Sequence, residues 1–378
     1  MKKKVSISRC AEYDDNAVYE GISGAVALMG GMDRFVRPGE RILLKPNLLA
    51  AKPPEAAVTT HPSVVRALIR LVKEAGATPV VGDSPGLGGA LKVAGRCGVL
   101  DVCKEEGVEF RDLKTPVMVE NPGGRTFKRL EVAAEVLDVD GVINLPKLKT
   151  HVQMLLTLGV KNIFGCVPGK LKPQWHLSAG VDRACFAAMI LDLYLFVNPR
   201  LTVMDGVVGM EGNGPSGGEP RPMGLIFAAG DAVSMDVVIA EVLGISAGTV
   251  PLQRTAEMRG IEGSRLEDIE ILGERVEDVR VEGFKLPPFS DTNFVSKLPY
   301  FLETRLRKAL TSRPHVANSA CTLCNVCVNV CPAEVMENIE RIRIDYDNCI
   351  RCYCCQEMCP QGAITSKQGW LKRIIPGL

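Results

Sequence analysis

The chain has 378 residues, of which 46% are hydrophobic and 24% are charged, and its formal net charge at pH 7 is +1. This composition is typical of a globular protein with about two or three domains. The near-neutral charge gives no sign of a nucleic-acid-binding surface or a polybasic membrane patch. No window of about twenty apolar residues is present, so we expect no membrane-spanning helix. The first residues, MKKKVSIS, have the basic flank of an export signal but lack its apolar core, so we expect a cytoplasmic protein.

Short apolar strands alternate with helices along residues 1–285. The pattern predicts strands at 5–10, 41–45, 78–81, 140–144, 200–204 and 223–229, and helices at 16–29, 64–75, 184–197 and 233–243. Thr60 or Ser63 is expected to cap the second helix, and Asp231 the last. Hairpins are expected at 116–132 and, on the sheet edge, at 269–281. This alternation predicts an α/β domain with a doubly wound, mostly parallel sheet.

Polar segments follow most of these strands, at the point where each strand ends. They are Lys45-Pro-Asn47, Asp83-Ser84, Lys147 to His151, Asp205-Gly206 with Asn213, and Asp231. In an open parallel sheet, ligands bind at the carboxyl ends of the strands. We therefore expect these segments to meet in one crevice. Three of the four histidines also lie in these loops, namely His61, His151 and His176.

Lysines are concentrated between residues 146 and 172. They are Lys147, Lys149, Lys161, Lys170 and Lys172. One interpretation is a solvated basic surface. The other is a pocket for a phosphate or carboxylate, because clustered ammonium groups and a glycine-rich backbone suit anions. The turn at 82–89 could also hold an anion or be a plain strand–helix junction, and it matches neither a Walker A loop nor G-x-G-x-x-G.

Individual roles stay open at several positions. His151 is a general acid/base or a structural hydrogen-bonding group, and Lys147 beside it is a second candidate proton donor. Asp205 is a cap, a metal ligand or a base, and Cys166 is a nucleophile or a small buried hydrophobe. The residues expected to bind a substrate or cofactor are Lys45, Asn47, His61, Asp83, Ser84, Lys149, Lys161, Asn162, His176, Asp205 and Asn213.

The C-terminal part contains a doubled cysteine motif. Nine of the 14 cysteines lie in CTLCNVCVNVCP (321–332) and CIRCYCCQEMCP (349–360). Both segments read C-x2-C-x2-C-x3-C-P, the spacing of bacterial two-cluster ferredoxins, in which the fourth cysteine binds the other cluster. The predicted 4Fe–4S ligands are Cys321, Cys324, Cys327 and Cys359 for cluster one, and Cys331, Cys349, Cys352 and Cys355 for cluster two. Cys354 is expected to be a spare thiol.

Zinc and disulfide bonds are the alternative uses of such cysteines. Zinc sites use paired C-x2-C knuckles rather than a run of four cysteines with a trailing proline. Disulfides are typical of short secreted chains, and the scattered remaining cysteines fit a reducing, anaerobic cytoplasm. We therefore expect a ferredoxin-like domain at 315–366. It should follow a linker at 286–314 with an amphipathic piece at 301–310, and precede a tail at 367–378.

As a set, the motifs resemble the domain-of-unknown-function 362 family. The matching segments are Lys45-Pro-Asn47, Thr60-His-Pro62, Gly82-Asp-Ser-Pro-Gly86, Pro146-Lys-x-Lys-Thr-His151, Gly159-Val-Lys-Asn162 with Phe164-Gly165, and Asp205-Gly206 through Gly214-Pro215. The resemblance covers 1–285 and, as in family members with a two-cluster module, 315–366. It implies no established substrate. The layout of 41–82 is also similar to the lactate racemase family of nickel-pincer enzymes, as an architectural likeness.

These observations predict an iron–sulfur oxidoreductase. Electrons from a soluble carrier or redox partner protein are expected to reach an anionic substrate or organic cofactor at the strand ends, with His151 or Lys147 supplying the proton. A flavin or other phosphate-bearing cofactor could be the intermediary, although no flavin or nicotinamide fingerprint is present. Two alternatives stay open. One is an electron-transfer or maturation protein without turnover, with a flat strand-end face. The other is a non-redox enzyme acting on a carboxylate, with structural clusters.

Overall fold

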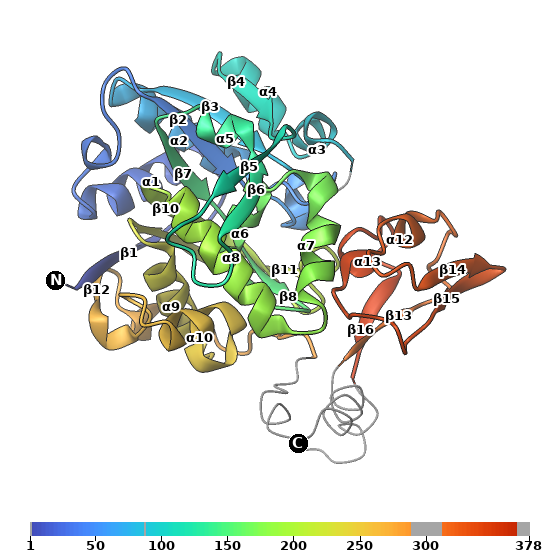
Figure 1. Cartoon of the computed structure of the whole chain (residues 1–378). Helices are drawn as coiled ribbons and strands as arrows, with labels where there is room; N and C mark the ends of the chain where they lie inside the picture. The colour runs from blue at the N-terminus through green and yellow to red at the C-terminus, as the bar shows by residue number, and fades with distance from the viewer. Residues whose placement is uncertain (1, 87, 289–311, 369–378) are drawn as a thin grey trace.

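Figure 1 shows the computed structural model of the chain, which describes residues 2–86, 88–288 and 312–368. A large α/β domain is followed by a smaller C-terminal unit. The expected amphipathic piece at 301–310, most of the linker and nearly all of the tail lie outside the described residues. Within the described ranges, no helix is long and apolar enough to cross a membrane.

The large domain is built on a ten-stranded sheet. Its strands are β1 (Lys3–Arg9), β2 (Arg41–Pro46), β3 (Thr78–Asp83), β4 (Glu109–Asp112), β7 (Gly141–Leu145), β8 (Lys147–His151), β9 (Leu155–Thr157), β10 (Leu201–Glu211), β11 (Glu219–Ala229) and β12 (Ile269–Gly273). The order is β12-β1-β11-β10-β7-β2-β3-β4, with β8 beside β10 and β9 beside β8. Six of the nine strand pairs are parallel, which confirms the prediction of a mostly parallel sheet.

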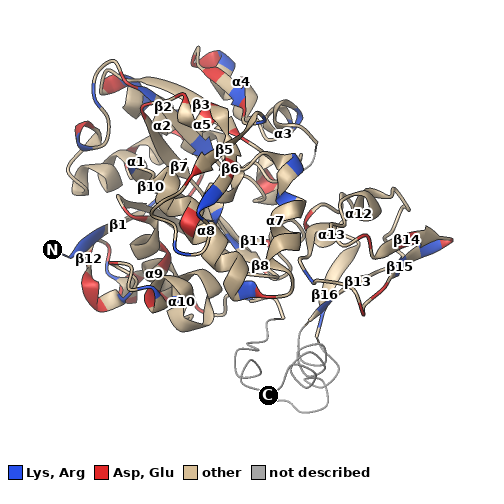
Figure 2. Ribbon diagram, in the orientation of Figure 1, with Lys and Arg blue, Asp and Glu red and all other residues tan. Residues whose placement is uncertain are grey.

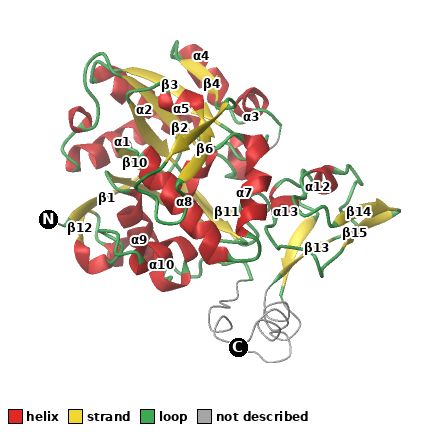
Figure 3. Ribbon diagram, viewed as in Figure 1, coloured by secondary structure: helices red, strands yellow, loops and turns green. Residues whose placement is uncertain are grey.

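Helices cover both faces of this sheet (Figure 1, Figure 3). One face carries α1 (Asp15–Leu28), α2 (Pro62–Glu74), α3 (Ala90–Arg96) and α4 (Val99–Glu105), and the other carries α6 (Gly159–Asn162), α7 (Lys172–Ala179), α8 (Arg183–Val197), α9 (Ala232–Val242) and α10 (Pro251–Met258). Successive side chains of a strand point to opposite faces. Leu44 accordingly packs with the α1 and α2 residues, and Leu43 with α8. Burial on both faces explains the continuous apolar runs in the sequence.

Two local predictions are confirmed. Asp231 caps α9 by accepting a hydrogen bond from the Val233 amide at 2.8 Å. The hairpin expected at 116–132 is formed by β5 (Pro116–Glu120) and β6 (Arg129–Ala133), which leads into α5 (Ala134–Leu137).

Two other local predictions are wrong. Neither Thr60 nor Ser63 caps α2, because the Nδ1 atom of His61 accepts from the Ser63 amide at 3.3 Å. The expected hairpin at 269–281 does not form. Its first half is β12, which pairs in parallel with β1, and Val276–Val279 is a 3-10 helix.

The most informative difference concerns the segment 147–151, which we expected to be a loop. It is strand β8, and all five of its residues are buried. The second half of β10 pairs with it, so β10 extends well beyond the predicted 200–204. Lysine at alternate positions is untypical of a buried strand, which is why the pattern indicated a loop. One lysine is neutralised inside the sheet, since Lys147 Nζ lies 2.9 Å from Asp205 Oδ2.

The C-terminal unit has its own small core. It consists of β13 (Arg313–Val316), α12 (Val326–Asn329), β14 (Met336–Ile339), β15 (Arg341–Ile344), α13 (Cys354–Glu357) and β16 (Ile364–Lys367). β13 pairs with β16 and β14 with β15, in both cases antiparallel, and β16 includes the strand position expected at Ile364. In Figure 1 the unit lies beside α7, with α13 on the side of the large domain.

The buried pair of Lys147 and Asp205 provides a test of what holds β8 in place. We expect Asp205→Ala to lower the free energy of unfolding by roughly 3–5 kcal/mol, because it leaves a buried ammonium group without its partner. The double variant Lys147→Met/Asp205→Leu should recover much of this loss. Guanidinium unfolding measures both effects. An unchanged midpoint for Asp205→Ala would show that the pair does not stabilise the sheet.

The matched control is an exposed ion pair on the β5–β6 hairpin. Glu120 and Arg129 lie 3.7 Å apart, and both side chains are at least 70% exposed. Glu120→Ala should change the free energy of unfolding by less than about 0.5 kcal/mol.

Candidate functional site

A cavity with a free volume of about 790 Å³ lies where β2, β3 and β8 end. The structure brings together here nine of the residues singled out in the sequence, namely Lys45, Asn47, Asp83, Ser84, Lys149, His151, Lys161, Asn162 and His176. Apolar side chains, including Leu48, Leu49 and Phe164, form the rest of the lining on the large domain. The cavity is therefore enclosed by both cationic and apolar groups.

The remaining wall comes from the C-terminal unit. Val330, Cys354, Glu357 and Met358 line it. Three contacts hold α13 there: Glu357 Oε1 lies 2.9 Å from His151 Nε2, the Ser216 hydroxyl donates to the Glu357 carbonyl at 2.9 Å, and Gln356 Nε2 donates to the Asn213 carbonyl at 3.0 Å. Asn213 thus contributes to the interface between the two units rather than to the cavity.

Lys45 and Asp83 form a buried ion pair in the cavity wall. Lys45 Nζ lies 2.8 Å from Asp83 Oδ1 and donates to the Pro46 carbonyl at 3.0 Å. The other carboxylate oxygen accepts from the Leu48 amide at 2.7 Å. Gly165 passes so close to the pair that a Cβ atom there would clash with both charged groups. The Phe-Gly sequence therefore allows the loop to approach the pair.

A chain of amide side chains fixes the position of Lys149. Asn47 Nδ2 donates to Asn162 Oδ1 at 3.0 Å, and Asn162 Nδ2 donates to Asn144 Oδ1 at 2.8 Å. Lys149 Nζ donates to Asn47 Oδ1 and to the Val58 carbonyl, each at 2.7 Å. None of these acceptors is charged. Burial and the nearby positive charge of Lys161 consequently lower the pKa of Lys149 to about 7.

Lys161 and Lys172 lie beside the ring of Phe164, each with its Nζ 5.6 Å from the ring centroid. Lys172 Nζ donates to the Ser84 carbonyl, and burial lowers its pKa to about 8. Burial also lowers the pKa of Lys161, whose Nζ has no acceptor within hydrogen-bonding distance among the described residues. Lys170 is exposed. The interpretation of a solvated basic surface therefore fits Lys170 but not Lys147, Lys149 or Lys161, which are buried.

The protonation of His151 follows from its contacts. Its Nδ1 accepts from the amides of Gln153 and Met154, at 3.1 and 3.3 Å. The proton of the neutral ring must therefore be on Nε2, the atom that faces Glu357. Burial lowers the pKa of His151 to about 4. Although burial opposes it, the contact with His151 and, to a smaller extent, the positive charge of Lys161 keep the pKa of Glu357 below its usual range.

Three of the predicted residues lie away from the cavity, in a cluster of their own. Asp205 accepts from the Tyr13 hydroxyl at 2.6 Å, from the His61 amide at 2.8 Å and from Lys147. The His61 ring stacks on Tyr13 with centroids 3.6 Å apart. Lys147, a candidate proton donor, is thus bound to a carboxylate outside the cavity. Cys166 is fully buried and does not line the cavity, and burial raises the pKa of its thiol to about 12, so the structure favours the small buried hydrophobe over the nucleophile.

The sequence analysis missed Thr157, Cys354 and Glu357 as lining residues. In the doubled motif, Cys354 occupies the position of Val326, and Glu357 that of Asn329. At these two positions the second half of the motif differs in residue type from the first half. This difference could have indicated that the segment does more than hold a cluster. No comparable signal marked Thr157, since it lies in a strand of only three residues.

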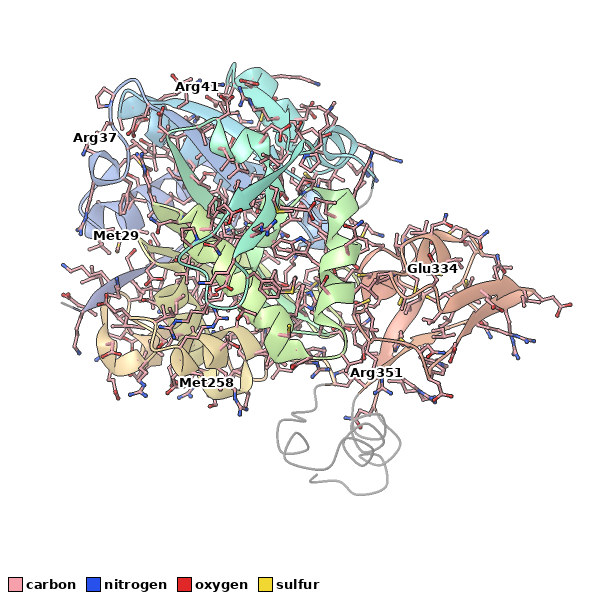
Figure 4. All side chains as sticks on the ribbon, in the orientation of Figure 1. Met29, Arg37, Arg41, Met258, Glu334 and Arg351 are labelled. Carbon is pink, nitrogen blue, oxygen red and sulfur yellow. The ribbon has the colours of Figure 1, made fainter. Side chains whose placement is uncertain are left out.

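The two predicted cysteine sets line two separate cavities in the C-terminal unit. The set Cys321, Cys324, Cys327 and Cys359 lines one of about 340 Å³, and the set Cys331, Cys349, Cys352 and Cys355 lines the other of about 320 Å³. Cys354 lines neither. Figure 4 shows the side chains of this unit, with Glu334 and Arg351 labelled.

Each cysteine set supplies the ligand type of an iron–sulfur cluster. All 14 cysteines of the chain are free. Within the described ranges, no three Cys, His, Asp or Glu side chains are placed to hold one metal ion. Four thiols around each mostly apolar cavity match the number and type of ligands that a cubane needs.

Charged residues of both signs are interspersed in the view of Figure 2, which colours the ribbon of both units by charge. The cavity lining, in contrast, contains more lysines than acidic residues.

Comparisons with known proteins match both the large domain and the C-terminal unit. Residues 42–241, more than half of the chain, match the family described as domain of unknown function (DUF362). Residues 313–360 match a 4Fe-4S dicluster domain, which binds two 4Fe–4S clusters. The chain is 40% identical over 293 residues to the thylakoid-associated protein sll1697 of Synechocystis sp.. This match covers 76% of this chain and 88% of that protein.

Two shorter matches are to subunits of other enzymes. The chain is 35% identical over 79 residues to NADH-quinone oxidoreductase subunit I of Pelobacter propionicus, covering 17% of this chain and 42% of that protein. It is 39% identical over 57 residues to the pyruvate synthase subunit PorD of Methanocaldococcus jannaschii, covering 15% of this chain and 66% of that protein.

Among solved structures, the lactate racemase apoprotein of Thermoanaerobacterium thermosaccharolyticum aligns with a TM-score of 0.39 and 11% identity. The alignment covers 62% of this chain and 56% of that chain. The extent of the family match and the 40% identical relative establish the assignment. The chain belongs to the DUF362 family and carries a C-terminal 4Fe–4S dicluster domain.

Proposed function

We propose that this protein is an iron–sulfur oxidoreductase that delivers electrons to an anionic substrate or organic cofactor bound in the cavity. The observation that carries the proposal is that the dicluster unit itself forms one wall of the cavity. Cys354, which adjoins the predicted cluster ligand Cys355, lines the cavity together with Glu357. Only the backbone between Cys354 and Cys355 would thus separate a ligand in the cavity from the cluster that Cys355 is predicted to bind.

The positions of the two cysteine sets favour one direction of electron transfer, from the first set to the second. Val330, next to Cys331, and Cys354, next to Cys355, both face the cavity, so the second set is adjacent to it. The first set includes Cys324, which is exposed. We therefore assign the entry of electrons from a soluble carrier to the first set and their delivery to the second.

The charges of the lining support an anionic ligand. Lys45, Lys149, Lys161 and Lys172 contribute four ammonium groups, and Asp83 and Glu357 contribute two carboxylates. The two histidines of the lining are held neutral, because burial lowers their pKa values to about 4 and about 3. An anion would balance the excess of positive charge among these buried groups.

The lining also contains a group suited to proton supply. Lys149 changes protonation near neutral pH, whereas His151 is neutral there and its Nε2 faces Glu357, so His151 orients neighbouring groups rather than supplying the proton. Lys149 is better placed than Lys147, which is bound to Asp205. The clusters supply single electrons, so a two-electron reduction needs two deliveries or an intermediary such as a flavin.

A cavity lined by charged side chains, in place of a flat strand-end face, argues against a protein that only carries electrons, because such a protein needs no ligand site. To test the proposal, we would purify the protein without oxygen, denature it and analyse the released small molecules by mass spectrometry. We expect an organic anion, and we expect that anion to reoxidise the dithionite-reduced protein. Reduced clusters that stay reduced in its presence would contradict the proposal, and turnover with the clusters held oxidised would indicate a non-redox enzyme.

The ligand sets of the clusters give a second prediction. Cys324→Ala should lower the iron content by about four atoms per chain, because one cubane loses a ligand. Cys354→Ala is the matched control, since this thiol lies beside a predicted ligand but lines neither cysteine cavity. It should retain the full iron content. Iron analysis and electron paramagnetic resonance of the reduced protein measure both. Unchanged iron in Cys324→Ala would refute the set.

The titration of Lys149 gives a third prediction. The charged groups near it are Lys161, Lys147, Glu357 and Asp83. Because only a protonated lysine attracts an anion, the affinity for benzoate should fall by up to about tenfold per pH unit above pH 7. Lys149→Met should weaken binding at pH 6 but have little effect at pH 9, where the lysine is already neutral. Calorimetric titration at both pH values measures this.

The exposed Lys170 supplies the control for that experiment. Lys170→Met removes one positive charge from the same region without entering the cavity, so benzoate affinity should stay at the wild-type value at both pH values. Equal effects of the two substitutions would mean that only the general charge of the protein matters.

A further inference from the structure

Three polar groups that line the cavity have no hydrogen-bonding partner among the described residues. They are Thr157 Oγ1, His176 Nδ1 and Lys161 Nζ. Thr157 is 4% exposed, His176 3% and Lys161 8%. Buried polar groups in folded proteins are nearly always paired, because an unpaired one destabilises the fold. Three such groups around one cavity therefore indicate that their partner is a ligand.

Two of these groups lie next to Lys149. Strand β9 is antiparallel to β8, with Thr157 directly opposite Lys149 in the register. Side chains directly opposite each other in such a pair are near neighbours on the same face of the sheet. Among the charged groups around Lys149, Lys161 has the largest effect on its pKa. Thr157, Lys149 and Lys161 thus bring a hydroxyl and two ammonium groups together from β9, β8 and α6.

We infer that Thr157, Lys149 and Lys161 form a subsite for the oxyanion of a small organic ligand, either a carboxylate or a phosphate. This inference rests on the proposed function. Lys149 uses two of its three protons on Asn47 and Val58, so one is left for the oxyanion. The three protons of Lys161 and the hydroxyl of Thr157 supply the other donors.

The other cations of the cavity are less available to a ligand. Lys45 is paired with Asp83, and Lys172 donates to the Ser84 carbonyl. The carboxylate of Glu357 also lines the cavity and lies 2.9 Å from His151, so it disfavours an anion in its immediate vicinity. The rest of the ligand then extends along the apolar lining. The apolar side chains that complete the lining suit an organic acid or phosphate ester better than a bare ion.

The decisive variant is Thr157→Val, which removes the unpaired hydroxyl and keeps the shape of the side chain. If the hydroxyl is kept for a ligand, the ligand-free variant should have a higher Tm than the wild type, while the affinity for the oxyanion should fall about fivefold. A purely structural threonine would give a lower Tm instead. Thr157→Ser, which retains the hydroxyl, should restore the affinity.

Lys161→Met tests the charged donor in the same way. It should lower the affinity about tenfold or more and also raise the Tm of the ligand-free protein, because it replaces a buried ammonium group by an apolar side chain. Lys170→Met, on the exposed part of the same region, should change neither quantity.

The measurements use the full-length protein with both clusters present and oxidised, at constant ionic strength. Calorimetric titration with sodium benzoate and with inorganic phosphate distinguishes the two oxyanions, and chloride is the reference. Binding of benzoate alone assigns the subsite to a carboxylate, and binding of phosphate alone assigns it to a phosphate. Absence of binding for both, or wild-type affinity in Thr157→Val and Lys161→Met, would overturn the inference.

These outcomes are separate from those that test the proposed function. Binding to the oxidised protein requires no electron transfer. If benzoate or phosphate binds as expected but no ligand reoxidises the reduced clusters, the subsite stands and the oxidoreductase proposal fails. If ligand-dependent reoxidation proceeds equally in the wild type, Thr157→Val and Lys161→Met, the oxidoreductase proposal stands and the subsite is refuted.

Discussion

The burial of lysine side chains on β8 is the constraint on which the rest of the structure depends. An ammonium group taken out of water must find a charged or hydrogen-bonding partner, or lose its proton. Lys147 obtains the Asp205 carboxylate from β10, and Lys149 obtains an amide and a carbonyl from the loops after β2. The polar groups at the ends of the neighbouring strands therefore stabilise the buried lysines of β8 within the sheet. The cavity lies beside these groups.

Much of the fold could be predicted, because its signals are local. The apolar run of β2 and the helical spacing of α8 identify these elements without knowledge of their neighbours. The cysteine spacing likewise indicates two clusters from a short segment alone. β8 could not be predicted in this way. Its alternating lysines resemble an exposed segment, and only partners distant in the sequence, such as Asp205, explain their burial.

The sequence predicted which strand ends meet at the candidate site. It did not predict which of their side chains line the cavity and which lie outside it. Strand ends converge in a parallel sheet, so Lys45, Asp83 and Lys149 could be expected to meet. Lys147 and Lys149, two positions apart, share a face of β8, but the pairing with β10 shifts between them, so that only Lys147 lies opposite Asp205. The contribution of Glu357 depends on how the C-terminal unit docks, and no local pattern encodes that.

The wall formed by α13 also bears on how the protein is made. Residues of the large domain leave the ribosome before α13 is synthesised, so the sheet can fold around an open crevice. The segment Cys354–Glu357 contains the predicted cluster ligand Cys355, so we expect it to take its final position only when iron and sulfide are loaded. The compartment is thus closed last, by the part of the chain that needs metal. A molecule starved of iron would leave its crevice open to solvent, and retention of small molecules would report on completed assembly.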